Sequence, residues 1–364
     1  MGLRCGIVGL PNVGKSTLFN ALSNAKAEAA NYPFCTIEPN IGVIIVPDER
    51  LNVLSEIVNP QKTIPTVVEF VDIAGLVKGA SKGEGLGNQF LGNIREVDAI
   101  IHVVRCFVDD NVTHVDGRID PVADKEIIEA ELQLKDLDTI EKRIQKKEKV
   151  AQSGDQAAKK EIAVLQKGKN ILESGENIRS GDLDPEELFF LRKEMQLLTS
   201  KPVIYIANVD EEGVHGNELT GKLGESIKND SSEMIVISAA LESQLAELGD
   251  DDRVLFLEEY GLKEIGLHKL ISISYRTLDL ITFFTAGEKE VRAWTVKKGS
   301  KAPKAAGTIH SDFEKGFIRA EVIKYEDYVK YKTEAACREA GKLNIEGKEY
   351  VVQDGDIMHF RFNV

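Results

Sequence analysis

The sequence has no apolar run long enough to cross a membrane, and its cysteines are few and scattered. No hydrophobic stretch reaches the ~18 residues that a membrane-spanning helix needs. The four cysteines are Cys5, Cys35, Cys106 and Cys337. They form no C-x-x-C pair and no zinc-like pattern with histidine, which argues against a disulfide framework or a zinc module. We therefore expect a cytoplasmic protein with reduced thiols and no membrane partner.

Positive charge is scarce as well. The 364 residues include 46 Lys and Arg against 60 Asp and Glu, which gives a net charge of −14. This balance favours solubility and opposes binding of nucleic acid or anionic membrane over the whole surface, although a local basic patch can still bind RNA. The length predicts two or three domains.

The first motif is a phosphate-binding loop near the N-terminus, Gly9-Leu10-Pro11-Asn12-Val13-Gly14-Lys15-Ser16, which matches the pattern G-x-x-x-x-G-K-[ST]. An apolar strand over residues 3–8 precedes it and helical spacing follows from Thr17. In this context backbone N–H groups and the helix N-terminus bind phosphate, Lys15 reaches the terminal phosphates and Ser16 binds Mg²⁺. The predicted nucleotide contacts here are Asn12, Val13, Gly14, Lys15, Ser16 and Thr17.

Two segments further along have the positions of nucleotide switches. Thr36 lies in a predicted loop before a strand over residues 41–46, where its hydroxyl can complete the Mg²⁺ shell. The strand predicted over residues 66–71 leads into Asp72-Ile73-Ala74-Gly75 and a glycine-rich stretch. We expect Asp72 to hold Mg²⁺ through water and the Gly75 N–H to bond the γ-phosphate.

The residue that positions the attacking water is not obvious. Ras-type enzymes place a glutamine directly after the glycine, and here that position holds Leu76, which cannot hydrogen-bond through its side chain. His114 lies in a polar loop beyond a strand predicted over residues 99–104, where ligand sites of α/β sheets gather. It is our candidate for this catalytic role, with a solvated loop histidine as the alternative. His102, inside that strand, is expected to be a core residue.

The base-recognition motif departs from that of guanine-binding enzymes. Strands predicted over residues 202–207 and 234–237 lead into Asn208-Val209-Asp210-Glu211 and Ser238-Ala239. Guanine readers have N-K-x-D, so the lysine is replaced by Val209 and the aspartate by Glu211, and adenine becomes a candidate base. The predicted base-side contacts are Asn208, Val209, Glu211, Ser238 and Ala239.

Between these motifs the chain changes character. Residues 121–199 are rich in charge, with apolar residues at helical spacing and a break at residues 153–155, which predicts a helical hairpin resembling a short coiled coil. A third helix is expected over residues 186–198, and the lysine-rich run 142–149 is expected to be a solvated helix face. Because the α/β pattern resumes afterwards, we assign residues 1–120 and 200–277 to one nucleotide-binding domain with a helical insertion.

The C-terminal part, residues 278–362, predicts a small β-grasp domain. Strands are expected over residues 281–285, 291–296, 350–352 and 357–362, and a helix over residues 311–318. Its residues 292–304 contain no acidic side chain, five basic ones and an aromatic: Arg292, Lys297, Lys298, Lys301, Lys304 and Trp294. We expect RNA to bind this stretch, with Trp294 available for stacking; the alternative is a rim that offsets local acidity.

Taken together, the motifs resemble the YchF/Obg-like ATPase family, in the translation-factor class of P-loop NTPases. The resemblance implies an α/β fold: a doubly wound, mostly parallel sheet with a coiled-coil-like insertion and a TGS-like β-grasp domain. It implies ATP as the nucleotide, Mg²⁺ held by Ser16 and Thr36, and association with the ribosome, through its large subunit. In related enzymes without the glutamine, an asparagine at the position of Asn12 helps to bind K⁺, so K⁺ is the expected activator.

The preferred interpretation is thus a slow, Mg²⁺-dependent ATPase that acts on the translation machinery as a nucleotide-controlled regulator. Two alternatives stay open. One is an Obg-type GTPase, although that group carries the N-K-x-D motif from which this chain departs. The other is an RNA- or ribosome-binding adaptor whose nucleotide site only stabilises the fold.

Overall fold

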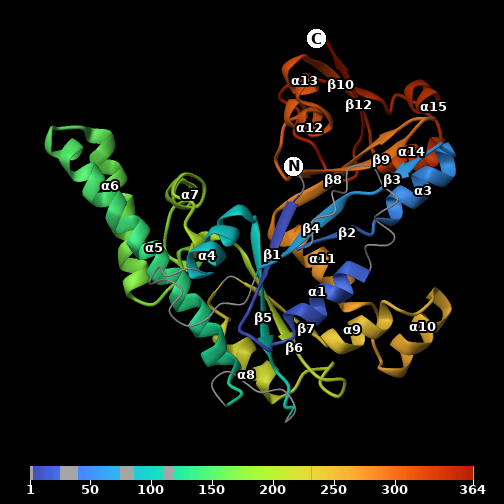
Figure 1. Cartoon of the computed structure of the whole chain (residues 1–364). Helices are drawn as coiled ribbons and strands as arrows, with labels where there is room; N and C mark the ends of the chain where they lie inside the picture. The colour runs from blue at the N-terminus through green and yellow to red at the C-terminus, as the bar shows by residue number, and fades with distance from the viewer. Residues whose placement is uncertain (1–2, 25–39, 74–85, 110–117, 231, 364) are drawn as a thin grey trace.

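A computed structural model describes residues 3–24, 40–73, 86–109, 118–230 and 232–363. These residues form two β-sheets and a long helical arm (Figure 1). The first sheet lies at the centre, the arm projects from one side of it, and the second sheet with its own helices lies at the C-terminal end. None of the helices in these ranges combines the length and the apolar character needed to cross a membrane.

The first sheet is mostly parallel, with its strands in the order β2-β4-β1-β5-β6-β7. Its strands are β1 (Leu3–Val8), β2 (Ile41–Ile45), β4 (Val67–Asp72), β5 (Ala99–Arg105), β6 (Val203–Asn208) and β7 (Glu233–Ile237). Strand β2 pairs antiparallel with β4, and the other pairings are parallel. The sequence predicts each of these strands to within one residue, because each is a short run rich in apolar and β-branched residues.

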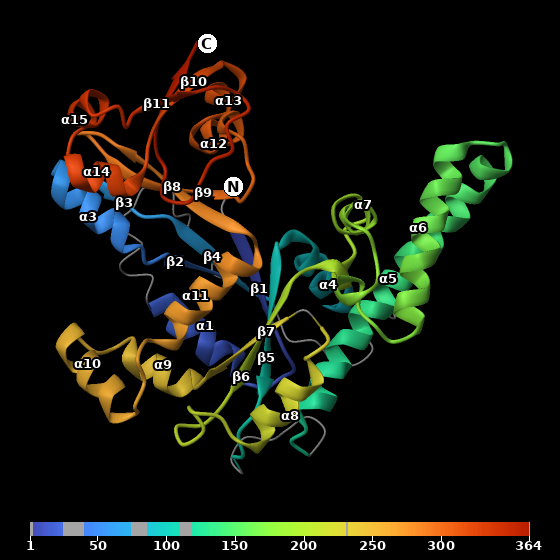
Figure 2. The same ribbon diagram turned by 180° about the vertical axis from the view of Figure 1, so that it is seen from behind.

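Helices cover both faces of this sheet (Figure 2). On one face lie α1 (Lys15–Asn24), α9 (Ala239–Leu245) and α11 (Gly266–Thr277), with α10 (Asp250–Glu259) beyond α9; on the other lie α4 (Leu86–Glu96), α5 (Pro121–Gln152) and α8 (Glu218–Ser226). This is the doubly wound α/β arrangement predicted from the sequence. In such folds ligands bind at the carboxyl ends of the strands.

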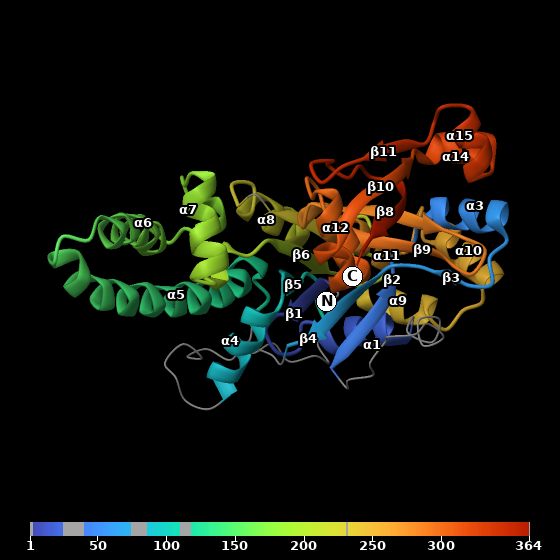
Figure 3. The ribbon, with the colours of Figure 1, turned by 90° about the horizontal axis from the view of Figure 1, so that it is seen from above.

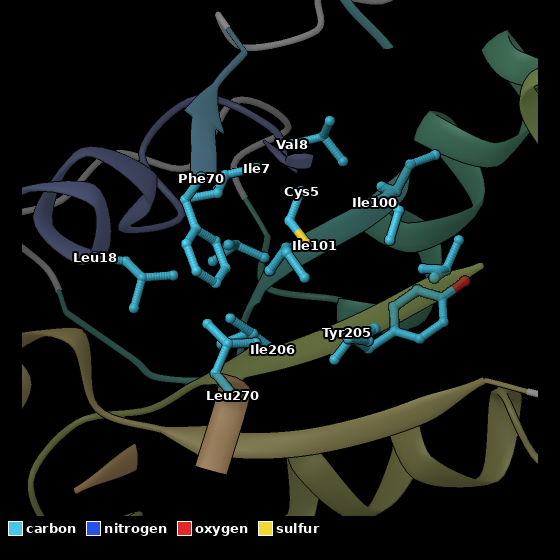
Figure 4. Close-up of a cluster of buried hydrophobic side chains, with 14 of the residues drawn as sticks. Cys5, Ile7, Val8, Leu18, Phe70, Ile100, Ile101, Tyr205, Ile206 and Leu270 are labelled. Atoms are coloured by element: carbon cyan, nitrogen blue, oxygen red, sulfur yellow. The ribbon is translucent and has the colours of Figure 1, made fainter. Parts of the chain in front are cut away.

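The core of the first sheet is apolar (Figure 4). Cys5, Ile101 and Ile206 lie on the neighbouring strands β1, β5 and β6, and all three are fully buried. Leu18 of α1 and Leu270 of α11 close this layer and are also fully buried. Each such aliphatic side chain stabilises the fold by roughly 1.5–3 kcal/mol relative to an exposed one. The cysteines in the described part of the chain are buried free thiols.

His102 and Tyr205 are polar side chains that lie within this core and contact each other. His102 of β5 is only 3% exposed, and its ring packs against that of Tyr205 of β6 with centroids 5.3 Å apart. Burial lowers the pKa of His102 to about 4, so the ring is neutral at pH 7. The expectation that His102 is a core residue is confirmed.

A buried polar network fixes the base of the arm to the sheet. Arg179, in the 3-10 turn η2 (Ile178–Ser180), donates to the carboxylates of Glu129 at 2.7 Å and Asp230 at 2.6 Å. The Tyr205 hydroxyl donates to Glu129 at 2.6 Å, and the Lys125 ammonium lies 3.2 Å from the same carboxylate. Buried charges are tolerated when paired in this way, and removing one partner is costly. The network therefore holds α5 and η2 against β6.

The arm itself is the predicted helical hairpin, made of α5 and α6 (Gln156–Glu173). The turn between them uses Gly154 at φ +98°, a conformation that favours glycine. Asp155 caps α6 by accepting a hydrogen bond from the Ala158 N–H at 2.9 Å. Buried Ile140 and Leu165 pack between the two helices.

The third helix of the insertion is shorter than predicted. The structure has α7 (Pro185–Phe189) and a π-helical turn, η3 (Phe190–Glu194), rather than a helix to residue 198. The chain turns at Gln196, which has φ +51°. The buried Asp136 carboxylate of α5 then accepts hydrogen bonds from the N–H groups of Leu198 and Thr199 at 2.9 and 2.8 Å, and these begin the 3-10 turn η4 (Leu198–Ser200). Helical spacing alone could not predict this tertiary contact.

The second sheet has the strand order β11-β10-β12-β8-β9-β3. Its strands are β3 (Thr63–Ile64), β8 (Leu280–Ala286), β9 (Val291–Lys297), β10 (Phe317–Ile323), β11 (Asn344–Glu346) and β12 (Ile357–Phe362). The helices around it are α3 (Glu49–Val58), α12 (Ala302–Ile309), α13 (Ser311–Lys315), α14 (Tyr325–Tyr331) and α15 (Glu334–Glu339).

Three predictions for this region are corrected. No strand forms over residues 350–352, where Val351 makes only a single bridge with Lys301. The helix predicted to reach residue 318 ends at Lys315, because Phe317 begins strand β10, which pairs with β11 and β12. Residues 302–309, for which no helix or strand is predicted, form α12, whose small alanines are buried against the sheet.

Residues 49–64 pack with the second sheet although the sequence assigns them to the nucleotide-binding domain. Leu51 and Leu54 of α3 lie in one apolar cluster with Phe284 and Val291, and β3 pairs with β9. The predicted division into residues 1–120 with 200–277, 121–199 and 278–362 stays a proposal, to which we add that residues 49–64 contact the C-terminal part.

The buried His102 predicts an acid-sensitive stability. Folding lowers the pKa of His102 from 6.5 to about 4. The contribution of the neutral His102 ring to the free energy of unfolding is therefore fully present above pH 6.5 and is lost as the pH falls toward 4. By pH 5 the loss is about 2 kcal/mol of unfolding free energy. We measure the free energy of unfolding in urea at pH 7 and at pH 5. Between these two pH values, His102→Phe should lose about 2 kcal/mol less of this free energy than wild type.

The matched control is His215→Phe, at an exposed histidine, which should keep the wild-type difference between pH 7 and pH 5. An equal difference in wild type and His102→Phe would contradict the assignment of acid sensitivity to this ring.

Candidate nucleotide-binding site

The phosphate-binding loop connects β1 to α1 and needs its two glycines for separate reasons. At Gly9, a Cβ atom would lie 2.6 Å from the Val103 carbonyl oxygen of β5, so only glycine allows this approach. Gly14 has φ +95°, and a Cβ there would clash with the Asn208 side-chain amide. The loop also places Asn12 at φ +63°, a left-handed conformation that asparagine tolerates.

Asn208 joins the two halves of the site. Its Nδ2 donates to the Val13 carbonyl at 2.9 Å, and its Oδ1 accepts from the Ala239 N–H at 2.9 Å. The residue ends β6 and is only 4% exposed. It therefore ties the phosphate-binding loop to the loop before α9, rather than presenting its amide to a ligand.

Lys15 and Asp72 form the charged centre of the site. Lys15 is only 9% exposed, and Asp72 is partly buried. Burial lowers the pKa of Lys15 and raises the pKa of Asp72, and each charge opposes the other's shift. The Lys15 Nζ donates to the Leu10 carbonyl at 3.4 Å, a weak bond that leaves the ammonium able to bind phosphate.

The Asp72 carboxylate passes a test for a metal-binding role. Its Oδ1 is buried and has no hydrogen-bond partner within the described residues. A buried carboxylate oxygen in this condition is costly unless a cation or water satisfies it. Ser16 is exposed in the first turn of α1, which follows the neighbouring strand β1. Its hydroxyl is available as a second oxygen ligand. Carboxylate and hydroxyl oxygens suit hydrated Mg²⁺.

The remaining predicted phosphate contacts are of two kinds. Asn12 and Thr17 are exposed, as Ser16 is, and can contact a ligand with their side chains. Val13 is 1% exposed and its side chain belongs to the core, so it can offer only backbone atoms. Thr36, Gly75, Leu76 and His114 lie outside the described residues, and their predicted roles stay predictions.

The base side of the site is built differently from the sequence expectation. Val209 is 3% exposed and lies in the core, with its N–H bonded to the Ile237 carbonyl at 3.0 Å. Ser238 is also buried and caps α9, accepting weakly from the Leu241 N–H at 3.4 Å. Because both side chains are buried, neither is exposed for contact with a base.

Glu211 is exposed, but its carboxylate is held. One oxygen accepts from Gln244 Nε2 and the other from the Tyr260 hydroxyl, each at 3.2 Å. Gln244 belongs to α9 and Tyr260 caps the end of α10. Sequence reasoning missed these two residues, because they belong to no motif and meet Glu211 only through the packing of α9 and α10.

The positive charge of the basic stretch 292–304 is partly neutralised by acidic residues from outside the stretch. Carboxylates from neighbouring segments lie within 4 Å of three of its five cations: Glu290 near Arg292, Glu349 near Lys301 and Glu314 near Lys304. Within the described residues, no carboxylate lies that close to Lys297 or Lys298. These two lysines are therefore the strongest anion-binding candidates of the stretch.

The expectation that Trp294 is free to stack on a base is corrected. The Arg292 guanidinium lies 3.9 Å from the centre of its ring, and the ring packs beside Phe283. Its indole N–H donates to Thr285 Oγ1 at 2.9 Å. Phe283 and Thr285 are neighbours on the paired strand β8, which the linear sequence does not reveal, whereas Arg292 lies two residues before Trp294 on β9 itself.

The chain is similar to known proteins along its whole length. A family model described as a 50S ribosome-binding GTPase matches residues 4–136. The model of the YchF GTPase C-terminal region, described as a protein of unknown function, matches residues 280–363. These matches cover the phosphate-binding half of the first domain and the second sheet.

Full-length relatives extend the likeness. The ribosome-binding ATPase YchF of Pasteurella multocida is 57% identical over 364 residues, and that of Bacillus subtilis 58% identical over 367, each covering 100% of both chains. The solved structure of the Schizosaccharomyces pombe YchF GTPase is 42% identical, has a TM-score of 0.89 and covers 99% of this chain and 98% of that one.

Proposed function

The chain belongs to the YchF family of P-loop NTPases, and from this membership we propose that it is a Mg²⁺-dependent ATPase that associates with the ribosome. The full-length relatives that carry the name ribosome-binding ATPase support this proposal. The observation that carries the chemistry is the buried Asp72 oxygen, which has no partner in the described residues and lies on the strand next to the phosphate-binding loop.

The proposed site works by positioning and charge. Lys15 and the backbone N–H groups of the loop bind the β- and γ-phosphates, and the Gly75 N–H senses the γ-phosphate. Ser16, Thr36 and Asp72 would hold Mg²⁺, which neutralises charge on the phosphates when bound. His114 is the proposed group that orients the attacking water, because Leu76 has no polar side-chain atom.

Phosphate release tests this function against the adaptor alternative. We expect slow, Mg²⁺-dependent release of phosphate from ATP by wild type, and a loss on the order of 10²-fold in Lys15→Ala, since one preorganised charge contributes that much. The control is Lys222→Ala, at an exposed lysine of α8, which should hydrolyse ATP like wild type. A wild-type protein that binds ATP without releasing phosphate would favour the adaptor.

We propose K⁺ as the activating cation, with Asn12 among its contacts. The support is the resemblance to NTPases that lack the catalytic glutamine, together with the exposed position of Asn12 in the loop. A monovalent cation there would add charge near the phosphates, where negative charge develops. We expect faster turnover in KCl than in NaCl of equal ionic strength, and Asn12→Ala should abolish the difference. Equal wild-type rates in the two salts would refute this.

ATP is the proposed nucleotide because the guanine clamp is missing. The Glu211 carboxylate is one methylene longer than aspartate and is bonded to Gln244 and Tyr260, so it is drawn away from the position that would pair with guanine. The lost charge-assisted hydrogen bond costs GTP about 1.5–3 kcal/mol. The names of the family model and of the solved neighbour say GTPase, so nucleotide choice needs a direct test.

Titration calorimetry should find ATP binding at least about tenfold tighter than GTP, as that energy requires. Glu211→Asp shortens the carboxylate beyond the reach of Gln244 and Tyr260 and should lower the ATP preference. The buried Val209 is left unchanged, since a lysine there would enter the core. The control is Glu212→Asp, at the adjacent exposed residue. GTP binding as tightly as ATP in wild type would contradict the proposal.

The ribosome is the proposed partner, through its large subunit. Lys297 and Lys298 are the proposed RNA contacts of the basic stretch 292–304, because the other three cations lie near carboxylates. Burial, then the nearby charges of Lys193 and Arg192, lower the pKa of Lys297, and the carboxylates of Asp98 and Asp279 oppose this shift only in part. Cations of the insertion and of the second sheet therefore lie close together. An anionic partner would relieve this repulsion.

The cytoplasmic location likewise stays a proposal.

A further inference from the structure

The tip of the helical arm concentrates positive charge in an acidic protein. We define the tip as residues 142–160, the end of α5, the turn and the start of α6. It contains seven basic and two acidic residues, a net charge of +5. Because the whole chain carries −14, the rest of the protein carries −19. A solvated helix face normally carries both signs in similar numbers, whereas here the basic residues outnumber the acidic ones seven to two.

Most of this positive charge is not neutralised within the chain. Lys142 pairs with Asp138 of the same helix at 2.7 Å, and Arg143 and Lys147 share the Glu161 carboxylate at 2.6 Å each. In contrast, no carboxylate in the described part of the chain lies within 4 Å of the ammonium groups of four exposed lysines of the tip, which are Lys146, Lys149, Lys159 and Lys160. The arm thus presents four unpaired cations to solvent.

Their placement puts exposed positive charge on both helices at the end of the arm. Lys142, Lys146 and Lys149 follow the spacing i, i+4, i+7, which puts them on one face of α5. That face is opposite Ile140, which is buried against α6. Lys159 and Lys160 lie on α6 just after the turn, in a helix with no acidic residue in its first turn. Figure 1 and Figure 3 show this end of the hairpin projecting away from both sheets.

The chemistry of the tip fits a phosphate backbone. It has no aromatic side chain for stacking on bases and a single arginine, so it lacks the groups that read base edges or bind unstacked bases. Lysine is a compact charge that suits phosphate oxygens. Among the described residues of the tip, the exposed large apolar side chains are limited to Val150, which is too little for the apolar centre of a protein interface.

We propose that the tip of the arm binds the phosphate backbone of helical RNA and is a ribosome contact of this protein. The inference rests on the proposed ribosome association and names a surface for it. Helical RNA is recognised mainly through its shape, phosphates and 2′-hydroxyls, which requires projecting cations rather than a pocket. The gain comes from release of the counterions condensed on the RNA, whereas isolated lysine–carboxylate pairs with an acidic protein contribute little.

The test replaces the four unpaired lysines in the full-length chain, as Lys146→Gln/Lys149→Gln/Lys159→Gln/Lys160→Gln. The matched control replaces four exposed lysines elsewhere: Lys263→Gln/Lys269→Gln/Lys289→Gln/Lys348→Gln. A third variant, Lys297→Gln/Lys298→Gln, reports on the basic stretch. Binding of a fluorescein-labelled 20-base-pair RNA duplex is measured by anisotropy over a KCl series, and ribosome binding by co-sedimentation.

We expect the tip variant to bind the duplex more than tenfold more weakly at low salt, with a log–log salt slope smaller by about 3, since each neutralised phosphate contributes about 0.7–0.9. Ribosome pelleting should fall in parallel. Helical circular dichroism and ribosome-free ATP hydrolysis should match wild type, because the tip is remote from the nucleotide site (Figure 1). The control variant should bind like wild type.

Three outcomes would overturn the proposal. Unchanged duplex affinity and slope in the tip variant would remove the phosphate contact, and so would an equal loss in the matched control. Loss of ribosome binding with unchanged duplex binding would assign the tip to a ribosomal protein instead of RNA. If wild type itself fails to pellet with ribosomes, the proposed function fails, while the duplex measurement still decides whether the tip binds phosphate.

Discussion

The two-ended hydrogen bonding of Asn208 is the constraint on which the nucleotide site depends. One amide group spans the space between the Val13 carbonyl and the Ala239 N–H, so the phosphate-binding loop and the loop before α9 hold each other in place. The position of this amide is also why Gly14 cannot have a Cβ atom. Because both backbone groups are buried, leaving either unpaired would cost about 1–3 kcal/mol. The loop geometry is thereby set before any ligand binds.

Strand β6 extends this constraint to the arm. Three residues before Asn208, Tyr205 donates to Glu129 of α5, and Arg179 joins Glu129 to Asp230. The same strand thus carries a contact to the phosphate-binding loop at its end and the anchor of the insertion at its middle. A long hairpin with a basic tip is in this way attached to the rigid part of the nucleotide-binding sheet.

The sequence predicts what depends on local pattern and fails where distant segments meet. The phosphate-binding loop, the strands of the first sheet and the hairpin follow from glycine spacing and from apolar periodicity. Strand β10 was missed because its residues continue from a helix-compatible stretch, and the third arm helix ends early because the Asp136 carboxylate, more than sixty residues away, binds Leu198 and Thr199. The partners of Glu211 and the contacts of Trp294 with Phe283 and Thr285 of β8 are likewise contacts between different elements.

The central claim is that Asn208 organises the site through backbone atoms of both loops rather than by contacting the base. Asn208→Ala, compared with the exposed Asn52→Ala of α3, should therefore weaken ATP and GTP binding by the same factor in titration calorimetry and lower stability by about 2 kcal/mol. A loss confined to one nucleotide, with unchanged stability, would show that Asn208 reads the base and would contradict the account.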